Sequence, residues 1–305
     1  AISNKENMSI KFLNRSQIDA VRWNKTIENS VSSRIYGYTW YLDAVTEGKW
    51  SALVYGDFEF VMPLPHRRKF FISYIYQPFI TQQLGIFGTT EITQDIVDIF
   101  LGSIPKKYLL VEANVRNLSI TIPTFQITPR QNHIIDLSAG YEELQKGYNR
   151  NTTRNLKSAQ EFNLQIELNL PLLHFLDFQS RNEPGNFTFP NQCFVKKLVG
   201  AANPHAEVIL AGVYDENGLI STGFFIVDQS RVYFLLCASS DAGKEKKAMF
   251  FLIDFMIKKY AGQKLLYDFT GSNIKSIEQR NLGFGAKMEI YQHIRRTSLF
   301  VKFLK

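Results

Sequence analysis

Apolar and polar residues alternate along the first half of the chain in a way that predicts a β-hairpin. Residues 50–55 and 58–64 are mostly apolar runs with strand-like alternation, separated by the pair Gly56-Asp57. Such runs on both sides of a Gly-Asp pair are a strong short-range hairpin signal. A strand over residues 70–76 is predicted next, after the basic turn 66–69. A helix over residues 92–100, with apolar residues at helical spacing, and a strand over residues 108–113 follow it.

The second half of the chain repeats this order of elements. Three strands are predicted over residues 206–214, 219–227 and 232–238. An apolar helix over residues 246–260, ended by Gly262, follows them, and two further strands are predicted over residues 264–269 and 287–295. Few residues are identical between the halves, so the repeat is one of pattern rather than of sequence. We therefore predict an α+β fold with two tandem modules, residues 8–137 and 138–305, each a mixed, mostly antiparallel sheet flanked by helices.

The second module is predicted to begin with one long helix over residues 138–162. Apolar residues follow one side of this helix at helical spacing, and Lys146, Arg150, Arg154 and Lys157 follow the other, spaced four, four and three apart. This stripe contains no acidic residue. Two interpretations stay open, a binding surface for an anionic ligand and an ordinary solvated face.

Charge and residue types narrow the function further. The 35 Lys and Arg residues exceed the 28 Asp and Glu residues, and the net charge of +7 favours anionic ligands without identifying nucleic acid. Cys193 and Cys237 lack metal or redox spacing, so both are predicted to be buried free thiols. The five histidines also lack metal-ligand spacing, and no hydrolase or P-loop sequence occurs, so we expect no metal site.

Signals for membrane insertion and export are missing from the sequence. No run of 18 apolar residues occurs, so we expect no transmembrane segment. No basic segment followed by an apolar one precedes Met8, which predicts a cytoplasmic protein.

Asp268-Phe-Thr-Gly-Ser272 at the end of a predicted strand, with the run 277–287 after it, resembles the C-terminal module of the Fem family of bacterial acyltransferases. In that family a strand ending in Asp-Phe-x-Gly-Ser precedes a helix that runs into Phe-Lys-x-x-Phe-Gly-Ala. Here Asp268-Phe-Thr-Gly-Ser272 precedes Arg280-Asn-Leu-Gly-Phe-Gly-Ala286. The run 150–157 is similar to the arginine-rich helix of the same module, and residues 40–43, 62–65 and 76–85 resemble the N-terminal module of uncharacterised bacterial members.

This resemblance covers nearly the whole chain and implies two tandem modules of the GNAT fold. It implies an N-acyltransferase or aminoacyltransferase that moves an activated acyl group to an amine bound between the modules. The expected donor is acyl-CoA or aminoacyl-tRNA. The expected acceptor is a small-molecule amine or a peptidoglycan precursor, which suggests cell-wall synthesis, with tRNA as a further partner.

Two departures from the family pattern keep other functions open. Asn281 stands where the family has the lysine of its Phe-Lys pair, and the loop 240–246 has one glycine where acetyl-CoA-binding loops have two small residues. These departures favour a catalytically inactive protein that binds a ligand on a GNAT scaffold. A weaker alternative is an RNA-binding protein that uses the cationic helix.

The resemblance and the predicted elements together suggest three groups of site residues. Asp268 and Glu112 interrupt apolar strands and are candidate bases for the attacking amine, with Tyr291 as a candidate acid; a structural role is the alternative for each. The candidate residues for binding the donor or a phosphate are Arg150, Arg154, Asn155, Lys157, Ala238, Ser239, Gly243 and Lys244. The candidate residues of an acceptor cleft are Tyr76, Gln82, Gln83, Gly85 and Asn281. A splayed β-bulge in the strand ending at Ala238, together with a cleft lined by Arg150 and Arg154, would support donor binding.

Overall fold

The computed structural model describes residues 9–116, 123–183, 185, 187–271 and 274–298. Its contacts divide the chain into two compact units, Ala1–Arg130 with Ile290–Lys305, and Gln131–Glu289. Both units combine helices with a sheet, as the α+β prediction requires.

The first unit contains a sheet with the strand order β1-β2-β3-β4-β6-β13, and β5 pairs with β3. The β4–β6 pair is parallel and the other pairs are antiparallel, so this sheet is mixed and mostly antiparallel as predicted. The elements are β1 (Ile10–Asn14), η1 (Arg15–Gln17), α1 (Ala20–Glu28), η2 (Ile35–Gly37), α2 (Thr39–Thr46), β2 (Trp50–Tyr55), β3 (Phe60–Lys69), β4 (Ile72–Ile75), β5 (Phe87–Gly88), α3 (Gln94–Gly102), β6 (Tyr108–Arg116) and β13 (Lys287–Thr297).

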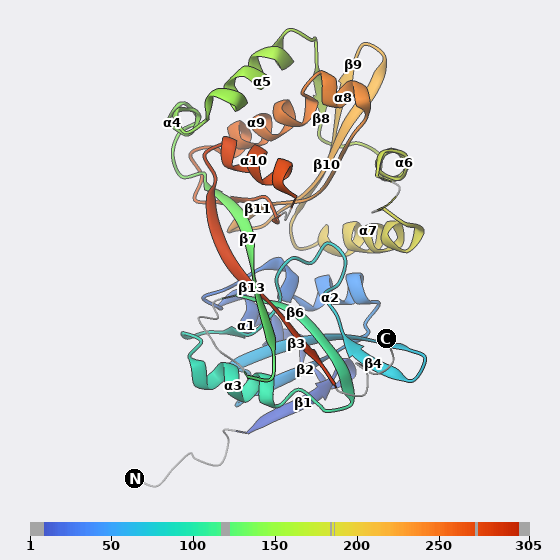
Figure 1. Ribbon diagram of the computed structural model, residues 1–305, viewed down its shortest axis with the longest axis vertical. Helices are drawn as coiled ribbons and strands as arrows, with labels where there is room; N and C mark the ends of the chain where they lie inside the picture. The colour runs from blue at the N-terminus through green and yellow to red at the C-terminus, as the bar shows by residue number, and fades with distance from the viewer. Residues whose placement is uncertain (1–8, 117–122, 184, 186, 272–273, 299–305) are drawn as a thin grey trace. The chain divides into compact units, whose positions relative to one another are not determined.

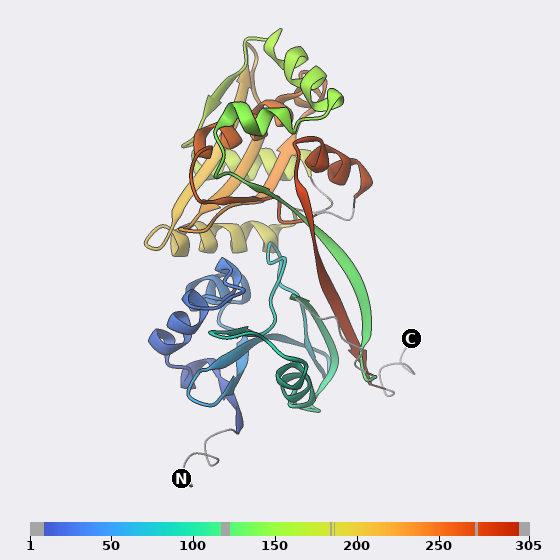
Figure 2. The same ribbon diagram turned by 90° about the vertical axis from the view of Figure 1, so that its left-hand side faces the viewer.

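Helices cover both faces of this sheet, with α3 on one side and α1 and α2 on the other (Figure 2). On the α3 side, Val97, Phe100 and Leu101 pack against buried residues of β2, β3 and β6. On the other side, Trp23 of α1 packs against Trp50 of β2 with ring centroids 5.1 Å apart. Because β2 is buried on both faces, all six of its residues are covered rather than every second one.

The second unit contains a sheet with the strand order β7-β12-β11-β10-β9-β8. Among the described strand pairs of this unit, β11–β12 is parallel, and β10–β11, β9–β10, β7–β12 and β8–β9 are antiparallel. The elements are β7 (Gln126–Asp136), α4 (Tyr141–Lys146), α5 (Arg150–Gln160), β8 (Gln165–Glu167), α6 (Leu172–Asn182), α7 (Phe189–Ala202), β9 (Glu207–Asp215), β10 (Gly218–Val227), β11 (Arg231–Ser239), α8 (Asp241–Glu245), α9 (Ala248–Tyr260), β12 (Leu266–Asp268) and α10 (Lys275–Gly283).

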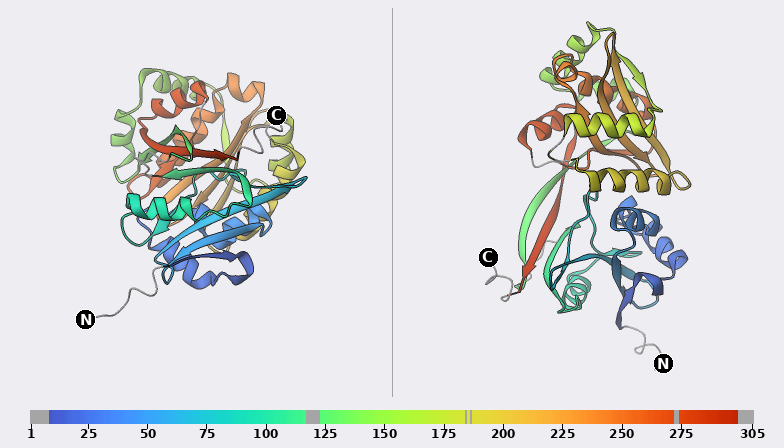
Figure 3. Two further views of the ribbon diagram at one scale, coloured as in Figure 1. Left: turned by 60° about the horizontal axis from the view of Figure 1, so that its bottom comes forward. Right: turned by 90° about the vertical axis from the view of Figure 1, so that its right-hand side faces the viewer.

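Neighbouring residues of the central strand β10 show how the second sheet is packed. Phe224 makes an edge contact with Phe175 of α6, whereas Phe225 belongs to the core that includes Leu252 and Ile253 of α9. Successive side chains of a strand point to opposite faces, so α6 and α9 cover opposite sides of the sheet. Figure 3 shows α6 and α7 side by side across one of these faces.

The last strand of the chain completes the sheet of the first unit. Residues Tyr291 to Thr297 of β13 pair antiparallel with Arg116 to Leu110 of β6 (Figure 1). The predicted boundaries, 8–137 and 138–305, assign this strand to the second module, whereas the contacts group Ile290–Lys305 with the first unit. The difference arises because strand pairing, which joins residues far apart in sequence, leaves no trace in local periodicity.

The predicted helix over residues 138–162 is interrupted, and this prediction was wrong. The structure has α4 and α5 separated at Gly147, and the Asn149 side chain caps α5 by accepting a hydrogen bond from the Thr152 amide. The Asn149 amide donates to the Gly283 carbonyl. The break therefore fits α5 against the end of α10.

The basic segment 66–69 is also different from the prediction, because it continues β3 rather than forming a turn. The turn falls at Phe70 and Phe71, between Lys69 and its strand partner Ile72. Alternation alone does not define a strand end, which depends on the pairing with β4.

Candidate functional site

A pocket of about 480 Å³ opens in the second unit at the carboxyl end of β11. Its walls come from β11, the region of α8 and the start of α9, and α10, with one residue each from α5 and the end of α6. The lining residues are Asn155, Glu183, Cys237, Ala238, Ser239, Gly243, Lys244, Lys247, Met249, Phe250, Ser276, Ile277 and Arg280.

The pocket lies where the two parallel strands of this unit stop pairing. The last pair joins Tyr233 of β11 to Asp268 of β12, and β11 continues to Ser239. Beyond this point the Thr270 hydroxyl donates to the Phe234 carbonyl at 2.7 Å, with a left-handed backbone at Thr270 (φ 54°). The chain thus turns away from β11 and leaves its edge to line the pocket.

The expected β-bulge is present in β11. Phe224 of β10 pairs with Leu236, but Phe225 pairs with Phe234, so Leu235 is an extra residue in β11. A bulge bends its strand and increases the local twist. This irregularity closely precedes Cys237, Ala238 and Ser239, the residues of β11 that line the pocket.

Positive charge predominates around the pocket, which has Lys244, Lys247 and Arg280 against the single acid Glu183. Lys244 also forms an exposed ion pair with Asp241 at 3.2 Å. Lys247 precedes α9 in a left-handed conformation (φ 57°), and the start of a helix carries partial positive charge on its unpaired amides. The pocket therefore suits an anionic group attached to an apolar one, because Met249 and Ile277 add apolar surface.

Adjacent residues of α10 have different surroundings. Arg280 lines the pocket, whereas Asn281 is completely buried. The Asn281 Oδ1 accepts hydrogen bonds from Arg280 Nη2 and Nε at 3.2 and 3.3 Å. One residue along a helix turns the side chain by about 100°, so at this end of the helix the pocket receives the arginine and not the asparagine.

Cys237 is a free thiol as predicted, but it is half-buried and lines the pocket rather than lying fully in a core. Burial raises the pKa of this thiol, and the neighbouring Arg280 guanidinium lowers it by a smaller amount. The thiol is therefore protonated at neutral pH. A protonated thiol is a weak nucleophile.

Five of the eight predicted donor-binding residues meet in this pocket, namely Asn155, Ala238, Ser239, Gly243 and Lys244. The other three, Arg150, Arg154 and Lys157, are exposed on α5 and do not line it. Their predicted role in donor binding stays a prediction.

Gly243 is required by packing between α8 and β10. A Cβ atom at this position would lie 2.2 Å from the carbonyl oxygen of Ile220. The Gly243 amide donates to the Ser240 hydroxyl, which caps α8. The single glycine of this loop thus lets α8 lie close to the sheet, beside the pocket.

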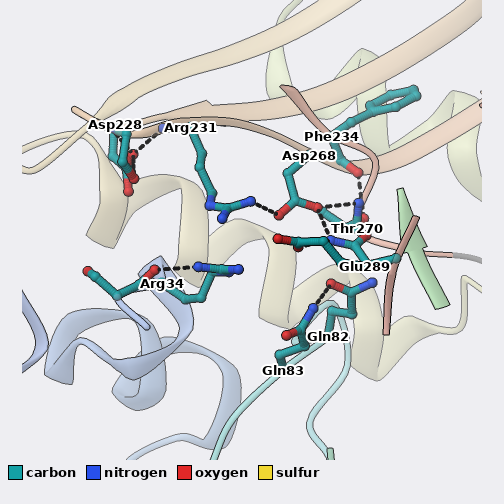
Figure 4. A network of polar contacts seen from close by, with 12 residues as sticks. Arg34, Gln82, Gln83, Asp228, Arg231, Phe234, Asp268, Thr270 and Glu289 are labelled. Atoms are coloured by element: carbon teal, nitrogen blue, oxygen red, sulfur yellow. Dashed lines mark hydrogen bonds and ion pairs between the residues drawn. The ribbon is translucent and has the colours of Figure 1, made fainter. Parts of the chain in front are cut away.

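Asp268 is completely buried and surrounded by donors (Figure 4). Its Oδ2 accepts from Arg231 at 3.0 Å, and its Oδ1 accepts from Asn132 at 3.0 Å and from the Thr270 amide at 2.8 Å. Buried charges need such partners. This arrangement suits a structural carboxylate that holds the end of β12, and the role of Asp268 as a base stays a prediction.

The other two candidate catalytic residues lie in the first unit. Glu112 of β6 forms an ion pair with Arg295 of β13, with Oε1 and Nε 3.1 Å apart, and these residues are direct strand partners. Tyr291 is buried on β13. Their catalytic roles stay predictions.

Four residues of the predicted acceptor cleft belong to one loop of the first unit and the adjacent strand end. Gln83 donates to the side chain of Gln82 at 2.9 Å, and both are buried. Gly85 has φ 125°, and a Cβ atom there would lie 2.4 Å from Cγ1 of Val115. Burial raises the pKa of Tyr76, whose ring lies 4.4 Å from the Arg67 guanidinium carbon. That these residues form a cleft with Asn281 stays a prediction.

Sequence reasoning missed Lys247, Cys237 and Arg280 as site residues, since it gave Cys237 only as a free thiol and Arg280 only within the segment that resembles the Fem family. The sequence indicates that Arg280 and Asn281 are adjacent on a helix. Which of the two faces the pocket depends on how α10 packs.

Among the described residues, no group of three His, Cys, Asp or Glu side chains is placed to hold a metal ion. None of the described helices has both the length and the hydrophobicity needed to cross a bilayer.

Comparisons with known proteins give matches of structure. No protein-family model matches the sequence, and no curated protein is a sequence match. The structure of FemX matches with a TM-score of 0.66 at 11% identity, over 93% of this chain and 97% of that chain. A conserved protein of unknown function from Bacteroides thetaiotaomicron matches with a TM-score of 0.58 at 9% identity, over 95% of this chain and 100% of that one.

A tandem GNAT protein from the clavulanic acid biosynthesis pathway also matches, with a TM-score of 0.56 at 6% identity, over 94% of this chain and 98% of that one. Identities this low establish the fold and not the reaction. The chain therefore shares the fold of FemX and of this tandem GNAT protein.

Proposed function

We propose that the chain transfers an activated acyl or aminoacyl group to an amine, with the donor bound in the pocket at the end of β11. The observation that carries this proposal is the pocket itself, in which the edge of β11, the start of α9 and Arg280 surround about 480 Å³. The fold shared with FemX and a tandem GNAT protein supports it. The acceptor is a small-molecule amine or a peptidoglycan precursor, and the protein works in the cytoplasm.

Transfer proceeds directly from donor to amine. The amine nitrogen attacks the carbonyl carbon, the new C–N bond forms, and the C–S bond of a thioester or the C–O bond of an ester breaks. The departing sulfur or oxygen takes up a proton while the amine loses one. Holding the two reactants together contributes on the order of 7 to 11 kcal/mol. A covalent intermediate on Cys237 is not part of this proposal, since burial keeps its thiol protonated.

Arg280 has the central electrostatic role in this proposal. Its guanidinium offsets the negative charge that develops on the carbonyl oxygen, and Asn281 holds it in place by accepting its hydrogen bonds. Removing one such donor typically lowers kcat by about 100- to 1000-fold. Lys247 and the start of α9 bind the phosphate of the donor.

The test is a transfer assay on the purified full chain, with panels of acyl-CoA and aminoacyl-tRNA donors and a mixture of amines. Arg280→Ala is expected to lower kcat by about 100-fold or more. Cys237→Ser, a nearly isosteric change in the same pocket, is the matched control and is expected to retain transfer. Loss of transfer in Cys237→Ser alone would contradict direct transfer.

The exposed cations of α5 separate the two classes of donor. For an acyl-CoA donor bound in the pocket, which neither arginine lines, Arg150→Ala/Arg154→Ala is expected to leave the KM unchanged. An aminoacyl-tRNA extends along α5, so the same double variant raises its KM, and the effect is largest at low salt. Lys25→Ala, which removes a lysine from α1 of the first unit, is the control for net charge. A double variant without effect on either donor would remove α5 from the donor site.

A catalytically inactive ligand-binding protein is the second candidate. The observation that favours it is Asp268, the predicted base of the second unit, whose two carboxylate oxygens are occupied by Arg231, Asn132 and the Thr270 amide. This candidate predicts that a donor binds and Arg280→Ala weakens binding, while no amine in the panel is acylated. Transfer to any amine excludes it, and absence of both binding and transfer contradicts both candidates.

A further inference from the structure

The turn between β3 and β4 carries two phenylalanines that the first unit leaves uncovered. Phe70 and Phe71 are 83% and 89% exposed. They are the two central residues of the hairpin in which Lys69 pairs with Ile72. Turns of this length normally carry glycine, asparagine or aspartate. Because both rings stay exposed, they do not stabilise the fold by burial, and their presence in this turn needs another explanation.

The backbone of the turn gives a second observation. Phe70 has φ 53°, the left-handed region in which a bulky side chain is strained. In two-residue hairpins, a positive φ at the first central position favours glycine. The turn is therefore less stable with phenylalanine than with glycine, and unusual strain of this kind often accompanies a binding function.

Positive charge surrounds the two rings. Arg67, Arg68 and Lys69 directly precede them and are exposed. The Lys69 ammonium lies 6.0 Å from the centre of the Phe70 ring. The segment thus combines a purely apolar tip with three cations on the strand behind it, and the described part of the segment, 67–71, contains no acidic residue.

We propose that this tip, residues 67–71, inserts into the interface of a membrane that contains anionic lipids. The two rings enter the boundary between headgroups and acyl chains, and the three cations contact lipid phosphates. A membrane fits better than a protein partner, because two phenylalanines bury far less than the roughly 800 Å² per partner of a stable protein interface. It fits better than single-stranded RNA, because bases stack on aromatic rings within a charged groove, and these rings lie at the end of a turn.

The test is binding of the full chain to vesicles of phosphatidylglycerol and phosphatidylcholine, followed by flotation, with no transferase substrate present. The wild-type chain is expected to bind these vesicles and not vesicles of phosphatidylcholine alone. Phe70→Gly/Phe71→Ser is expected to weaken binding by on the order of 100-fold, because it removes both rings from the lipid. Arg68→Gln/Lys69→Gln is expected to weaken it by about 10-fold, and about 1 M salt is expected to weaken the wild type similarly.

The substitution of glycine for Phe70 also keeps the test free of folding effects. Glycine adopts the observed φ without strain, so the thermal stability of Phe70→Gly/Phe71→Ser is expected to equal or exceed that of the wild type. The matched control is Phe189→Ser on α7 of the second unit, where Phe189 is 75% exposed; it is expected to bind vesicles like the wild type. Vesicle binding that survives loss of both rings, or binding of single-stranded RNA in place of vesicles, would overturn the proposal.

Discussion

At the scale of single residues, the hydrogen-bond and ion-pair partners of the Asp268 carboxylate indicate a role in stability rather than in catalysis. Asp268 is fully buried, and its ion pair with Arg231 is itself almost inaccessible. The cost of burying two charges is offset by their mutual attraction and by the additional hydrogen bonds from Asn132 and Thr270. The pair joins β11 to the end of β12, where the pocket begins.

Replacing Asp268 with asparagine is expected to destabilise the chain by about 3 to 5 kcal/mol, because Arg231 then stays buried without its counter-charge. Chemical denaturation of the purified variant measures this free energy of unfolding. Glu112→Gln is the control, since its ion pair with Arg295 is about a third exposed and is expected to contribute at most about 1 kcal/mol. If Asp268→Asn were as stable as the wild type but inactive, Asp268 would act as a catalytic base.

At the scale of elements, one lysine connects the β9–β10 turn to the helices beside the pocket. The Lys246 ammonium, between α8 and α9, lies 2.7 Å from Asp215 and 2.9 Å from Glu216. Asp215 also accepts hydrogen bonds from the amides of Asn217 and Gly218 in the turn. The turn therefore holds Lys246, and with it the start of α9, in place.

The contribution of Asp215 is expected to depend on pH. The hydrogen bond from Lys246, followed by the turn amides, lowers the pKa of Asp215 below its ordinary value. A lowered pKa stabilises the folded chain above the ordinary carboxyl value of about 4, and this stabilisation is lost as the pH falls through the lowered value. Asp215→Asn should therefore have a lower Tm than the wild type at pH 7, by a margin that shrinks below about pH 4.

Thermal unfolding of both proteins between about pH 2 and 7 measures this margin. Glu216→Gln is the matched control, because Glu216 contacts the same lysine from an exposed position and is expected to lower the Tm less. A margin for Asp215→Asn that stays constant with pH would show that the carboxylate charge has no part in it.

At the scale of the whole molecule, the end of the chain belongs structurally with its beginning. Ile294 of β13 is fully buried in the core formed by α3, β2, β3 and β6. The sheet of the first unit thus includes a strand that follows the whole second unit in the sequence. Until β13 pairs with β6, that edge of the sheet lacks its partner strand, and exposed edges promote aggregation.

Ile294→Ala is expected to destabilise the first unit by about 2 to 5 kcal/mol, although the residue is close to the C-terminus. Hydrogen exchange would show reduced protection in β6 and α3, with β9 and β10 much less affected. Ile257→Ala, a fully buried residue of α9, is the matched control and should give the opposite pattern. Equal loss of protection in both units would mean that they unfold as one.

The amino-acid sequence by itself determined most elements and the tandem fold, because period-two and helical patterns and turn residues act over short distances. Some of the residues it named as donor-binding candidates, among them Ala238, Ser239 and Gly243, line the pocket at the end of β11. Tertiary structure decided the rest. The packing of α10 turns Arg280 and not Asn281 into the pocket, and pairing across 37 positions gives Asp268 its partner Arg231. Pairing with β6 returns the last strand to the first unit. Each of these outcomes depends on contacts between residues far apart in sequence, which local patterns do not encode.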